Sequence, residues 1–472
     1  MKGRSLLLKA GEIAKITGGE ILSGSAERIC KGVSTDSRDI DRGNLFVPII
    51  GGNFDGHDFI GKAVEQGAAV VLVQRDKSER FKCSVTDVPI IIVGDTLKSL
   101  GDIASFWRKQ FDVPIVAVTG SSGKTTTKEM IASVVSLSRN ILKNHGNFNN
   151  LIGLPLTLLQ LNDGHKAVIL EMGTNRRGEI ERLTHIADPD VGIITNIGPA
   201  HLEGLKSLDL VVKEKGDLFG NMKNNGVAVV NRDDSAISDL LERWKGKSLT
   251  FGMYGNAFVT AEDVTVEGRE GINFTLAIEG KRKRINIDAM GRHNVSDALA
   301  AAACSWALGI EYNQICSGLE GFKQLPGRMR LHRLKKGISL IDDTYNANPA
   351  STREAIETLN EIKGDNDIFV VMADMLELGD SAAKMHEEIG SLMARRGVKR
   401  IFLSGNLVMS LANGAKKEGL MQDQIVLQAT PEMVVDQLYS FVKRGDFILV
   451  KGSRGMKMEQ YVNAIITAFG ED

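Results

Sequence analysis

A glycine-rich segment of the sequence has the residue types and the spacing that bind a phosphate. It follows the apolar run Ile115–Val118, precedes a helical pattern, and consists of Gly120, Ser121, Ser122, Gly123, Lys124, Thr125 and Thr126. Glycines let backbone N–H groups curl around a phosphate, and the N-terminus of the next helix adds positive potential. Lys124 can reach the β- and γ-phosphates, and the Thr125 hydroxyl can bind Mg²⁺. The pattern is GxxGKTT, since Val118 replaces the first glycine of the common loop, and it still predicts a phosphate site.

Two further side chains follow apolar runs soon after this loop. Glu171 ends the run Ala167–Leu170, and His201 follows the run Val191–Ile194 after a short polar stretch. Mg²⁺ prefers hard oxygen ligands, so the Glu171 carboxylate is a candidate metal ligand. A capping or solvent-facing carboxylate is the alternative for Glu171. His201 is a candidate for contact with a ligand or substrate, and a purely structural histidine is the alternative.

The elements that must position these residues follow an α/β pattern. Short apolar runs alternate with helical stretches, which is typical of strands buried on both faces of a parallel sheet. The runs are Ile115–Val118, Ala167–Leu170, Val191–Ile194, Val227–Val230, Ile338–Ile341, Ile368–Met372, Arg400–Leu403 and Phe447–Val450. Ligands bind beyond the carboxyl ends of the strands in open parallel sheets. Because most of these runs end in polar or charged residues, we expect two sites, or one shared site, at those ends.

Changes in pattern divide the chain into three expected domains. Residues 96–110 have the apolar spacing of a helix, which we expect to link the first domain to the second. A break near Leu325-Pro326-Gly327 precedes a restart of the α/β pattern. We predict a smaller mixed α/β N-terminal domain (1–100), a central P-loop parallel-sheet ATPase domain (101–324) and a C-terminal Rossmann-like α/β domain (325–472).

Two segments of the expected central domain predict local structure. Residues 249–287 alternate and contain turn glycines, which indicates a small antiparallel patch, and residues 291–308 have a helical pattern. Within the patch, Lys281–Arg284 is a basic run. A solvated hairpin is favoured there over a nucleic-acid site, because the run is short and the protein is neutral.

Composition excludes several classes of protein. The chain has 472 residues, with 58 Lys and Arg against 59 Asp and Glu, and 43% of its residues are hydrophobic. These values exclude a disordered polyelectrolyte and a broadly basic nucleic-acid coat. The longest apolar stretch, 298–310, is too short for a membrane span, and Leu6–Leu8 is too short for a signal peptide. The cysteines form no CxxC pair, and they are Cys30, Cys83, Cys304 and Cys316. We expect a cytoplasmic protein that neither enters a membrane nor binds nucleic acid.

Several motifs accompany the phosphate loop along the chain. They are Ser34–Arg38, Leu45–Pro48, Gly56–Phe59, Asn147–Asn150, Glu171–Gly173, Asn196–Glu203, Lys213–Phe219, Gly291–Asn294, Leu325–Arg328, Asp342–Pro349, Ala373–Gly379 and Lys451–Arg454. Together with the loop they resemble the Mur ligases, which make the peptide stem of the bacterial cell wall. The resemblance covers nearly the whole chain. It implies that residues 1–100 bind a UDP-sugar and that residues 101–324 bind ATP.

The resemblance implies ATP-driven formation of an amide bond. A carboxylate is a poor acyl donor, whereas the acyl phosphate made from it and ATP can be attacked by an amine. Residues 342–349 and 373–379 are most similar to family members that use UDP-N-acetylmuramoyl-tripeptide and D-alanyl-D-alanine in peptidoglycan precursor synthesis. The implied cofactors are ATP and two Mg²⁺ ions, and we expect a monomer. A Mur-type or folylpolyglutamate-type ligase with another amino substrate and a P-loop switch ATPase remain alternatives.

The resemblance also assigns roles to four candidate catalytic residues. Lys124 neutralises phosphate charge, and Thr125 with Glu171 holds one Mg²⁺. His201 resembles the ligand of a second Mg²⁺. Lys215 matches a lysine that the family carries as a carbamate, which gives an anionic oxygen ligand in place of a cationic ammonium. An ordinary surface lysine in a charged helix is the alternative for Lys215.

Binding residues follow from the same motifs. The expected nucleotide-binding residues are those of the phosphate loop together with Asn294, Arg328 and Asp343. Asn294 is expected near the nucleotide base, and Arg328 and Asp343 are expected to reach the nucleotide from the other side of the break near Leu325-Pro326-Gly327. The expected substrate-binding residues are Ser34, Thr35, Asp36, Ser37, Arg38, Phe46, His57, Asn149, Asn346 and Asn348. Arg38 suits a diphosphate, because a guanidinium donates two parallel hydrogen bonds, although a structural salt bridge competes with that role. Asn346 and Asn348 suit either ATP or the dipeptide.

Overall fold

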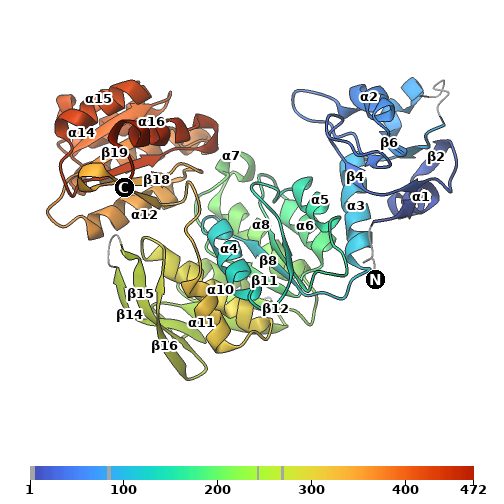
Figure 1. Cartoon of the computed structure of the whole chain (residues 1–472), viewed down its shortest axis with the longest axis horizontal. Coiled ribbons are helices and arrows are strands. Elements are labelled where there is room, and N and C mark those ends of the chain that lie inside the picture. The colour runs from blue at the N-terminus through green and yellow to red at the C-terminus, as the bar shows by residue number, and fades with distance from the viewer. Residues whose placement is uncertain (1–5, 82–86, 242–243, 267–269) are drawn as a thin grey trace.

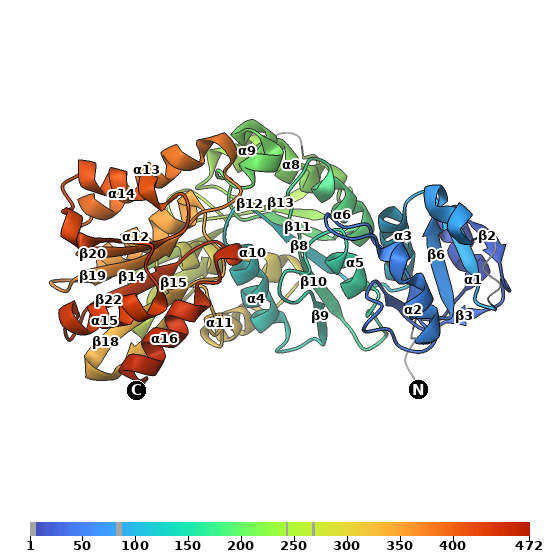
Figure 2. The same ribbon diagram turned by 90° about the horizontal axis from the view of Figure 1, so that it is seen from above.

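The computed structural model describes residues 6–81, 87–241, 244–266 and 270–472. Its main sheets lie in a row, with the N-terminal and C-terminal sheets at opposite ends and a nine-stranded sheet between them (Figures 1 and 2). All eight predicted strands occur, with bounds that differ by a few residues at most. The helices predicted over residues 96–110, after the phosphate loop, and over residues 291–308 occur as well. The division of the chain at residues 100 and 324 stays a prediction.

The N-terminal part combines a small mixed sheet with short helices. Its five-stranded sheet has the order β2-β7-β6-β5-β4, with β2 antiparallel and the other strands parallel, while β1 and β3 pair separately. The elements are β1 (Leu8–Lys9), α1 (Ala10–Thr17), β2 (Glu20–Ser23), β3 (Ile29–Cys30), β4 (Val33–Ser34), β5 (Leu45–Phe46), the 3₁₀ helix η1 (Gly56–Phe59), α2 (Ile60–Glu65), β6 (Val70–Gln74), η2 (Arg75–Phe81), β7 (Ile90–Val93) and α3 (Thr96–Arg108).

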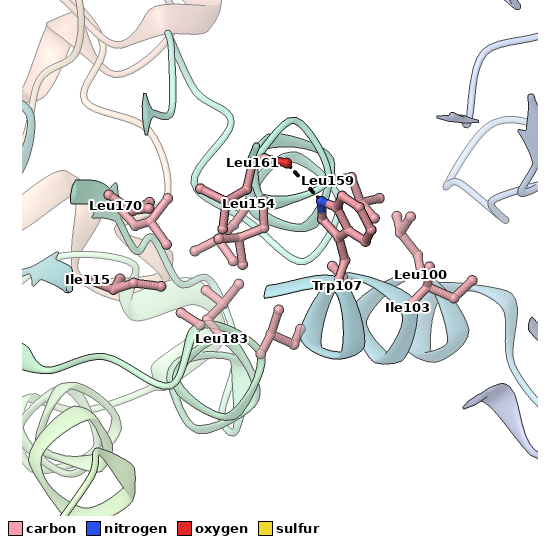
Figure 3. Packing of buried hydrophobic residues seen from close by; sticks show 14 of the residues in the cluster. Leu100, Ile103, Trp107, Ile115, Leu154, Leu159, Leu161, Leu170 and Leu183 are labelled. Carbon is pink, nitrogen blue, oxygen red and sulfur yellow. Dashed lines mark hydrogen bonds between the residues drawn. The ribbon is translucent and has the colours of Figure 1, made fainter. Parts of the chain in front are cut away.

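Helix α3 connects this part to the central one. Asp95 caps its first turn by accepting a hydrogen bond from the Lys98 N–H at 2.8 Å. Leu100, Ile103 and Trp107 are buried in one core cluster with leucines of the central part, and Figure 3 shows Trp107 next to Leu154 and Leu159. The indole Nε1 of Trp107 donates to the Leu161 carbonyl at 3.0 Å. The expected boundary after residue 100 therefore falls inside a helix whose buried side chains belong to one continuous core.

The central sheet has the order β16-β15-β14-β13-β12-β11-β8-β10-β9 and is parallel from β9 to β14. Its elements are β8 (Ile115–Thr119), α4 (Lys124–Val135), β9 (Ile141–Lys143), α5 (Gly153–Leu158), β10 (Ala167–Glu171), α6 (Glu179–Ala187), β11 (Val191–Ile194), α7 (Leu202–Leu205), α8 (Leu208–Asn221), β12 (Val227–Asn231), α9 (Ser235–Leu241), β13 (Lys247–Gly252), β14 (Val259–Val266), β15 (Ile272–Ile278), β16 (Lys281–Ile287), α10 (His293–Ala307) and α11 (Tyr312–Glu320).

The antiparallel patch expected over residues 249–287 begins later than predicted. Strand β13 pairs in parallel with both β12 and β14, and antiparallel pairing begins only between β14 and β15. The patch extends the large sheet, because its buried residues share one core with helices α4 and α10. The basic run Lys281–Arg284 lies on β16 with its side chains exposed, as a solvated hairpin requires.

The C-terminal sheet has the order β17-β18-β22-β19-β20-β21, and only β17 is antiparallel. Its elements are β17 (Arg330–Leu334), η4 (Lys335–Gly337), β18 (Ile338–Asp343), α12 (Pro349–Ile362), β19 (Ile368–Ala373), η5 (Gly379–Ser381), α13 (Ala382–Arg395), β20 (Arg400–Ser404), α14 (Val408–Lys417), η6 (Gln422–Gln424), β21 (Ile425–Leu427), α15 (Pro431–Phe441), β22 (Phe447–Lys451), η7 (Arg454–Met456) and α16 (Glu459–Phe469).

The structure bears on two predictions made from composition, which concern the cysteines and the membrane. Cys30, Cys304 and Cys316 are buried free thiols, and Cys83 lies outside the described residues. Within the described ranges, none of the helices combines the length and the apolar character that crossing a bilayer requires.

Candidate active site

The phosphate loop follows the strand β8, whose neighbours on either side supply the residues around it. Gly120 has φ +152° and Gly123 has φ +76°. A Cβ atom would lie 1.9 Å from the Thr195 Oγ1 at Gly120 and 2.3 Å from an Asp297 carboxylate oxygen at Gly123. Both positions therefore require glycine. The first turn of α4 follows directly, and its N–H groups have no partners within the helix, which suits an anion.

The loop is held in place from the segment that follows β11. The Ser121 N–H donates to the Asn196 carbonyl at 3.0 Å, and the Ser122 N–H donates to the Asn196 side-chain oxygen at 2.9 Å. The Ser121 hydroxyl donates to the Gly198 carbonyl at 2.9 Å. These contacts use the first two serine amides internally, so the amides at the start of α4 remain for a phosphate.

Lys124 begins α4 and turns back over the loop. Its Nζ donates to the Gly120 carbonyl at 2.8 Å. Burial lowers the pKa of Lys124, and the nearby Glu171 carboxylate works against that shift. A longer contact of 3.5 Å joins the Nζ to the Ser121 carbonyl. An ammonium held by neutral carbonyls of the loop is well placed to bind an anion such as a phosphate.

Thr125 and Glu171 form the candidate metal site. Glu171 is buried at the end of β10, and its Oε2 accepts a hydrogen bond from the Thr125 hydroxyl at 2.6 Å. Asn149 donates to the other oxygen of Glu171 at 2.8 Å. The solvent-facing alternative for Glu171 is therefore wrong. Mg²⁺ fits this pair, since adjacent ligand oxygens of its octahedron lie about 2.9 Å apart for bonds of 2.0–2.1 Å.

The described residues contain no group of three or more His, Cys, Asp or Glu side chains arranged to hold a metal.

Lys215 lies on α8 directly behind the phosphate loop. Its side chain is 1% exposed, and its Nζ donates to the Gly120 carbonyl at 2.9 Å. Burial and the neighbouring Lys124 lower the pKa of Lys215 well below its usual value, against a smaller opposing effect of Glu214. The surface-lysine alternative is therefore wrong.

The adjacent Glu214 serves a different purpose. Its carboxylate accepts hydrogen bonds from the N–H groups of Gly178 and Ile180 at 2.7 and 2.8 Å, at the start of α6. It also pairs with Arg177 at 3.1 Å and accepts from the Thr174 hydroxyl. Glu214 is therefore held at the start of α6, while the Lys215 Nζ donates to a backbone carbonyl of the phosphate loop.

One cavity of about 560 Å³ lies between the central and C-terminal parts and brings most of the predicted nucleotide and metal residues together. Arg328 spans the two parts, because its guanidinium donates to the Thr125 hydroxyl at 2.7 Å and stacks on the Tyr345 ring at 4.0 Å. Gly120 and Lys215 lie behind its wall. The predicted residues that line it are Ser121, Ser122, Gly123, Lys124, Thr125, Thr126, Asn149, Glu171, His201, Asn294, Arg328, Asp343, Asn346 and Asn348.

Three of these residues also have structural partners. The Asn294 amide donates to the Met290 carbonyl at 2.6 Å. The Asp343 carboxylate accepts from the Met329 N–H at 3.1 Å and forms an ion pair with Lys451, its register partner on β22. Asn348 caps α12. These contacts fix the cavity wall before any ligand binds.

His201 lies at the same cavity but reaches the C-terminal part. Its Nδ1 is 2.8 Å from the Glu377 carboxylate, and the His201 backbone is in the left-handed region with φ +56°. The residue follows β11, as the sequence predicts, and joins the loop after that strand to the loop after β19.

A second cavity, of about 840 Å³, lies between the N-terminal and central parts. Ser34, Thr35 and Asp36 line it together with central residues that include Phe148 and Gln160. Arg38 pairs with Asp36 through two hydrogen bonds of 2.7 and 2.9 Å, yet its side chain is 80% exposed. The structural salt bridge considered for Arg38 is thus present, and the exposed guanidinium still faces solvent.

The remaining predicted substrate residues are not brought to this second cavity. Phe46 is buried in the core of the N-terminal part, and Ser37 is buried as well. His57 is 2% exposed, contacts Asp55 at 2.6 Å, and accepts a hydrogen bond from the Gln74 N–H at 3.0 Å. These residues are therefore part of the folded core of the N-terminal part.

Comparisons with known proteins agree with this geometry. Residues 118–305 match the model of the Mur ligase middle domain, 327–454 that of the Mur ligase glutamate ligase domain, and 30–108 that of the Mur ligase family catalytic domain. The chain belongs to the Mur ligase family. Membership of this family favours a ligase over the P-loop switch considered above.

Relatives of this Mur ligase extend over nearly its whole length. It is 34% identical to the UDP-N-acetylmuramoyl-tripeptide–D-alanyl-D-alanine ligase of Bacillus subtilis over 96% of this chain and 97% of that one. A MurF structure from Acinetobacter baumannii superposes with a TM-score of 0.88 at 30% identity, covering 98% and 99% of the two chains. A MurF structure from Thermotoga maritima in complex with ADP has a TM-score of 0.82 at 27% identity, covering 93% and 97%.

Several cavity residues of this Mur ligase were missed by the sequence reasoning. Asp297 lies on α10 one helical turn after Asn294, and that i,i+3 spacing was a usable signal. Burial raises the pKa of Asp297 well above its usual value. Glu377 and Lys451 occur in motifs that had been recognised without a role, and Tyr345 lies beside Asp343 in such a motif.

Proposed function

We propose that this chain uses ATP to join D-alanyl-D-alanine to the tripeptide carboxylate of UDP-N-acetylmuramoyl-tripeptide, in peptidoglycan precursor synthesis. One observation carries the proposal. The phosphate loop, Glu171 and Arg328 converge on one cavity, in a chain that matches UDP-N-acetylmuramoyl-tripeptide–D-alanyl-D-alanine ligases over nearly its whole length. The ADP complex of the Thermotoga maritima relative supports a nucleotide in that cavity.

The reaction begins with transfer of the γ-phosphoryl group of ATP to the tripeptide carboxylate. The carboxylate oxygen bonds to phosphorus, the bond from phosphorus to the β,γ-bridging oxygen breaks, and ADP leaves. Lys124 and Arg328, which both line the cavity, would offset the charge of the transferring group. The amine of the dipeptide then attacks the acyl carbon, phosphate departs, and the amide forms with loss of one proton.

Magnesium belongs to this proposal through residues that fit it. Thr125 and Glu171 would hold one ion, and His201 with Lys215 would hold a second; such ions neutralise phosphate charge. The buried Lys215 amine would first add to CO₂, forming an N–C bond and releasing a proton, to give a carbamate. Burial of Lys215 and the nearby Lys124 support that state, because both favour the neutral amine that can attack CO₂.

The two cavities divide the substrates. We assign the UDP-sugar to the second cavity beside Ser34, Thr35 and Asp36, with residues 1–100 as its domain. Asn346 and Asn348 lie on the C-terminal side of the first cavity, where the incoming dipeptide or ATP would contact them. A monomer remains part of the proposal, since a single chain supplies the described residues that line both cavities. A cytoplasmic location remains part of it as well, since the proposed reaction consumes ATP.

Phosphate release tests the assignment directly. We expect release from ATP only when UDP-N-acetylmuramoyl-tripeptide and D-alanyl-D-alanine are both present, with one amide formed per phosphate. Tripeptides that end in lysine and in diaminopimelate should be compared. Release without either substrate would support a switch ATPase, and release with a single amino acid in place of the dipeptide would support a different ligase.

A further inference from the structure

The loop after β19 carries an acidic residue that the proposed reaction does not use. Glu377 lies at the first cavity, and its carboxylate is 2.8 Å from the His201 Nδ1 of the central part. The backbone joins the same two segments, because the Glu203 N–H donates to the Glu377 carbonyl at 3.1 Å. Two independent contacts therefore fix this loop against the segment that contains His201.

Both partners have unusual backbone conformations. His201 has φ +56° and Glu377 has φ +65°, in a region that side chains other than glycine rarely adopt. Such conformations are strained and persist only where the surroundings fix them. Here they face each other across the boundary between the central and C-terminal parts.

The loop that presents Glu377 is braced along its length. The Met375 N–H donates to the His386 Nε2 at 2.9 Å, and the Leu376 N–H donates to the Ser453 hydroxyl at 2.8 Å. The Asp374 carboxylate accepts from two successive amides after β20, at 2.8 and 3.0 Å. Glu377 is thus presented by a rigid loop, and its place depends on the position of the whole C-terminal part.

The chemistry of the pair fixes one state of the imidazole. A carboxylate only accepts hydrogen bonds, so the Nδ1 of a neutral His201 carries the proton and the Nε2 keeps its lone pair. Histidines that bind a ligand through one nitrogen commonly donate the other N–H to a carboxylate, which sets tautomer and ring orientation. Protein contacts thus prepare His201 to offer Nε2 to a ligand.

We propose that Glu377 is the positioning residue of His201, so that the C-terminal part completes the central site only when it is closed against it. The inference rests on the proposed role of His201 in that site. It gives domain closure a chemical consequence: in an open arrangement His201 loses the acceptor that selects its tautomer.

The chain offers a matched control for this inference. Arg292 at the start of α10 forms an ion pair with Glu361 on α12 at 2.9 Å, and this ion pair joins the same two parts as the contact between His201 and Glu377. The carboxylates of Glu361 and Glu377 are both about half-exposed, and Glu361 does not line the cavity. If the contacts of Glu361 and Glu377 only hold the two parts together, then Glu361→Ala and Glu377→Ala should lower kcat to the same extent.

Steady-state kinetics of the full chain give the first comparison. Glu377→Ala should lower kcat about 10–100-fold, the range for loss of a residue that orients a ligating histidine, with the KM for ATP within twofold. Glu377→Gln, which keeps an acceptor oxygen, should recover part of that loss. Glu361→Ala should stay within twofold of the wild type. Equal losses in both alanine variants would overturn the inference.

A spectrum of the imidazole nitrogens tests the tautomer without any reaction. In enzyme with ¹⁵N-labelled histidine, the His201 signal is assigned by its loss in His201→Gln. We expect Nδ1–H in the wild type and in Glu361→Ala, and a gain of Nε2–H in Glu377→Ala. An unchanged His201 signal in Glu377→Ala overturns the positioning role alone. A fully active His201→Gln variant overturns the proposed role of His201 and this inference with it.

Discussion

Lys124 and Lys215 donate to the same backbone oxygen, that of Gly120, at 2.8 and 2.9 Å. The positive φ of Gly120 places this carbonyl between α4 and α8. Two ammonium groups so close to one acceptor repel each other, and burial removes the water that would screen them. The pKa of Lys215 falls accordingly, with burial as the main cause and Lys124 as the second. One carbonyl therefore relates the phosphate-binding lysine to the lysine proposed to carry CO₂.

Lys215→Ala should abolish ligation because the proposed anionic oxygen ligand is lost. We expect phosphate release to fall about 10²–10³-fold, the effect of removing a strong electrostatic group from a closed site. Added short carboxylic acids, such as acetate, should partly restore the rate by occupying the space of the carbamate. Lys213→Ala is the control, since Lys213 lies two residues away on the same helix and is exposed. A fully active Lys215→Ala enzyme would end the carbamate proposal.

Lys124→Ala should separate the two cavities. Turnover of ATP should fall about 10²–10³-fold, because the charge that offsets the phosphates is gone. Binding of the UDP-substrate, measured by calorimetry, should remain within a few-fold, since the second cavity does not contain Lys124. Lys109→Ala, at an exposed position after α3, serves as the control. Loss of both ATP turnover and binding of the UDP-substrate would contradict the assignment of the substrates to separate cavities.

The parts of this site that lie on strand ends were predictable from sequence. The run Val191–Ile194 is β11 without any change of bounds, and Glu171 ends β10 as expected. Fully buried parallel strands read as uninterrupted apolar runs, and their carboxyl ends meet at one edge. Local sequence is therefore sufficient to place Glu171 and the phosphate loop together.

Contacts between residues far apart in the sequence were not predictable in this way. The bond from Arg328 to Thr125 and the pair of His201 with Glu377 join residues far apart in the chain, and no local spacing encodes them. The motifs also failed to distinguish residues that line a cavity from residues that are buried in the core. Phe46 and His57 belong to recognised motifs, yet the fold buries both of them.

Glu214→Gln should destabilise the central part without touching a ligand. The buried carboxylate accepts two backbone hydrogen bonds at the start of α6 and pairs with Arg177. An amide in its place turns an NH₂ group toward donors, which leaves a buried N–H unsatisfied and costs about 1–3 kcal/mol. We expect a lower midpoint in thermal unfolding followed by tryptophan fluorescence. Glu181→Gln, at an exposed site on α6, should unfold like the wild type, and equal midpoints for all three would refute the capping role.

His386 should make the stability of the C-terminal part fall at acidic pH. Its side chain is buried, its Nδ1 donates to the Ala382 carbonyl at 2.7 Å, and its Nε2 accepts from the Met375 N–H. Burial lowers the pKa of His386 from 6.5. Below pH 6.5 His386 becomes protonated in the unfolded chain but stays neutral in the folded one. Stability therefore decreases as pH falls from about 6.5 toward the lower folded-state pKa.

The expected pH dependence can be measured with urea series at pH 7.5 and 5.5, read by hydrogen exchange of peptides from α13. His386→Gln should reduce the difference between the two midpoints. His332→Gln should increase it, because the Asp342 carboxylate, 4.0 Å from Nε2, and Glu471 raise the pKa of His332. A raised pKa adds stability below pH 6.5 and loses it as pH rises through the folded value, so its removal has the opposite sign. Parallel shifts in all three proteins would show that neither histidine controls the transition.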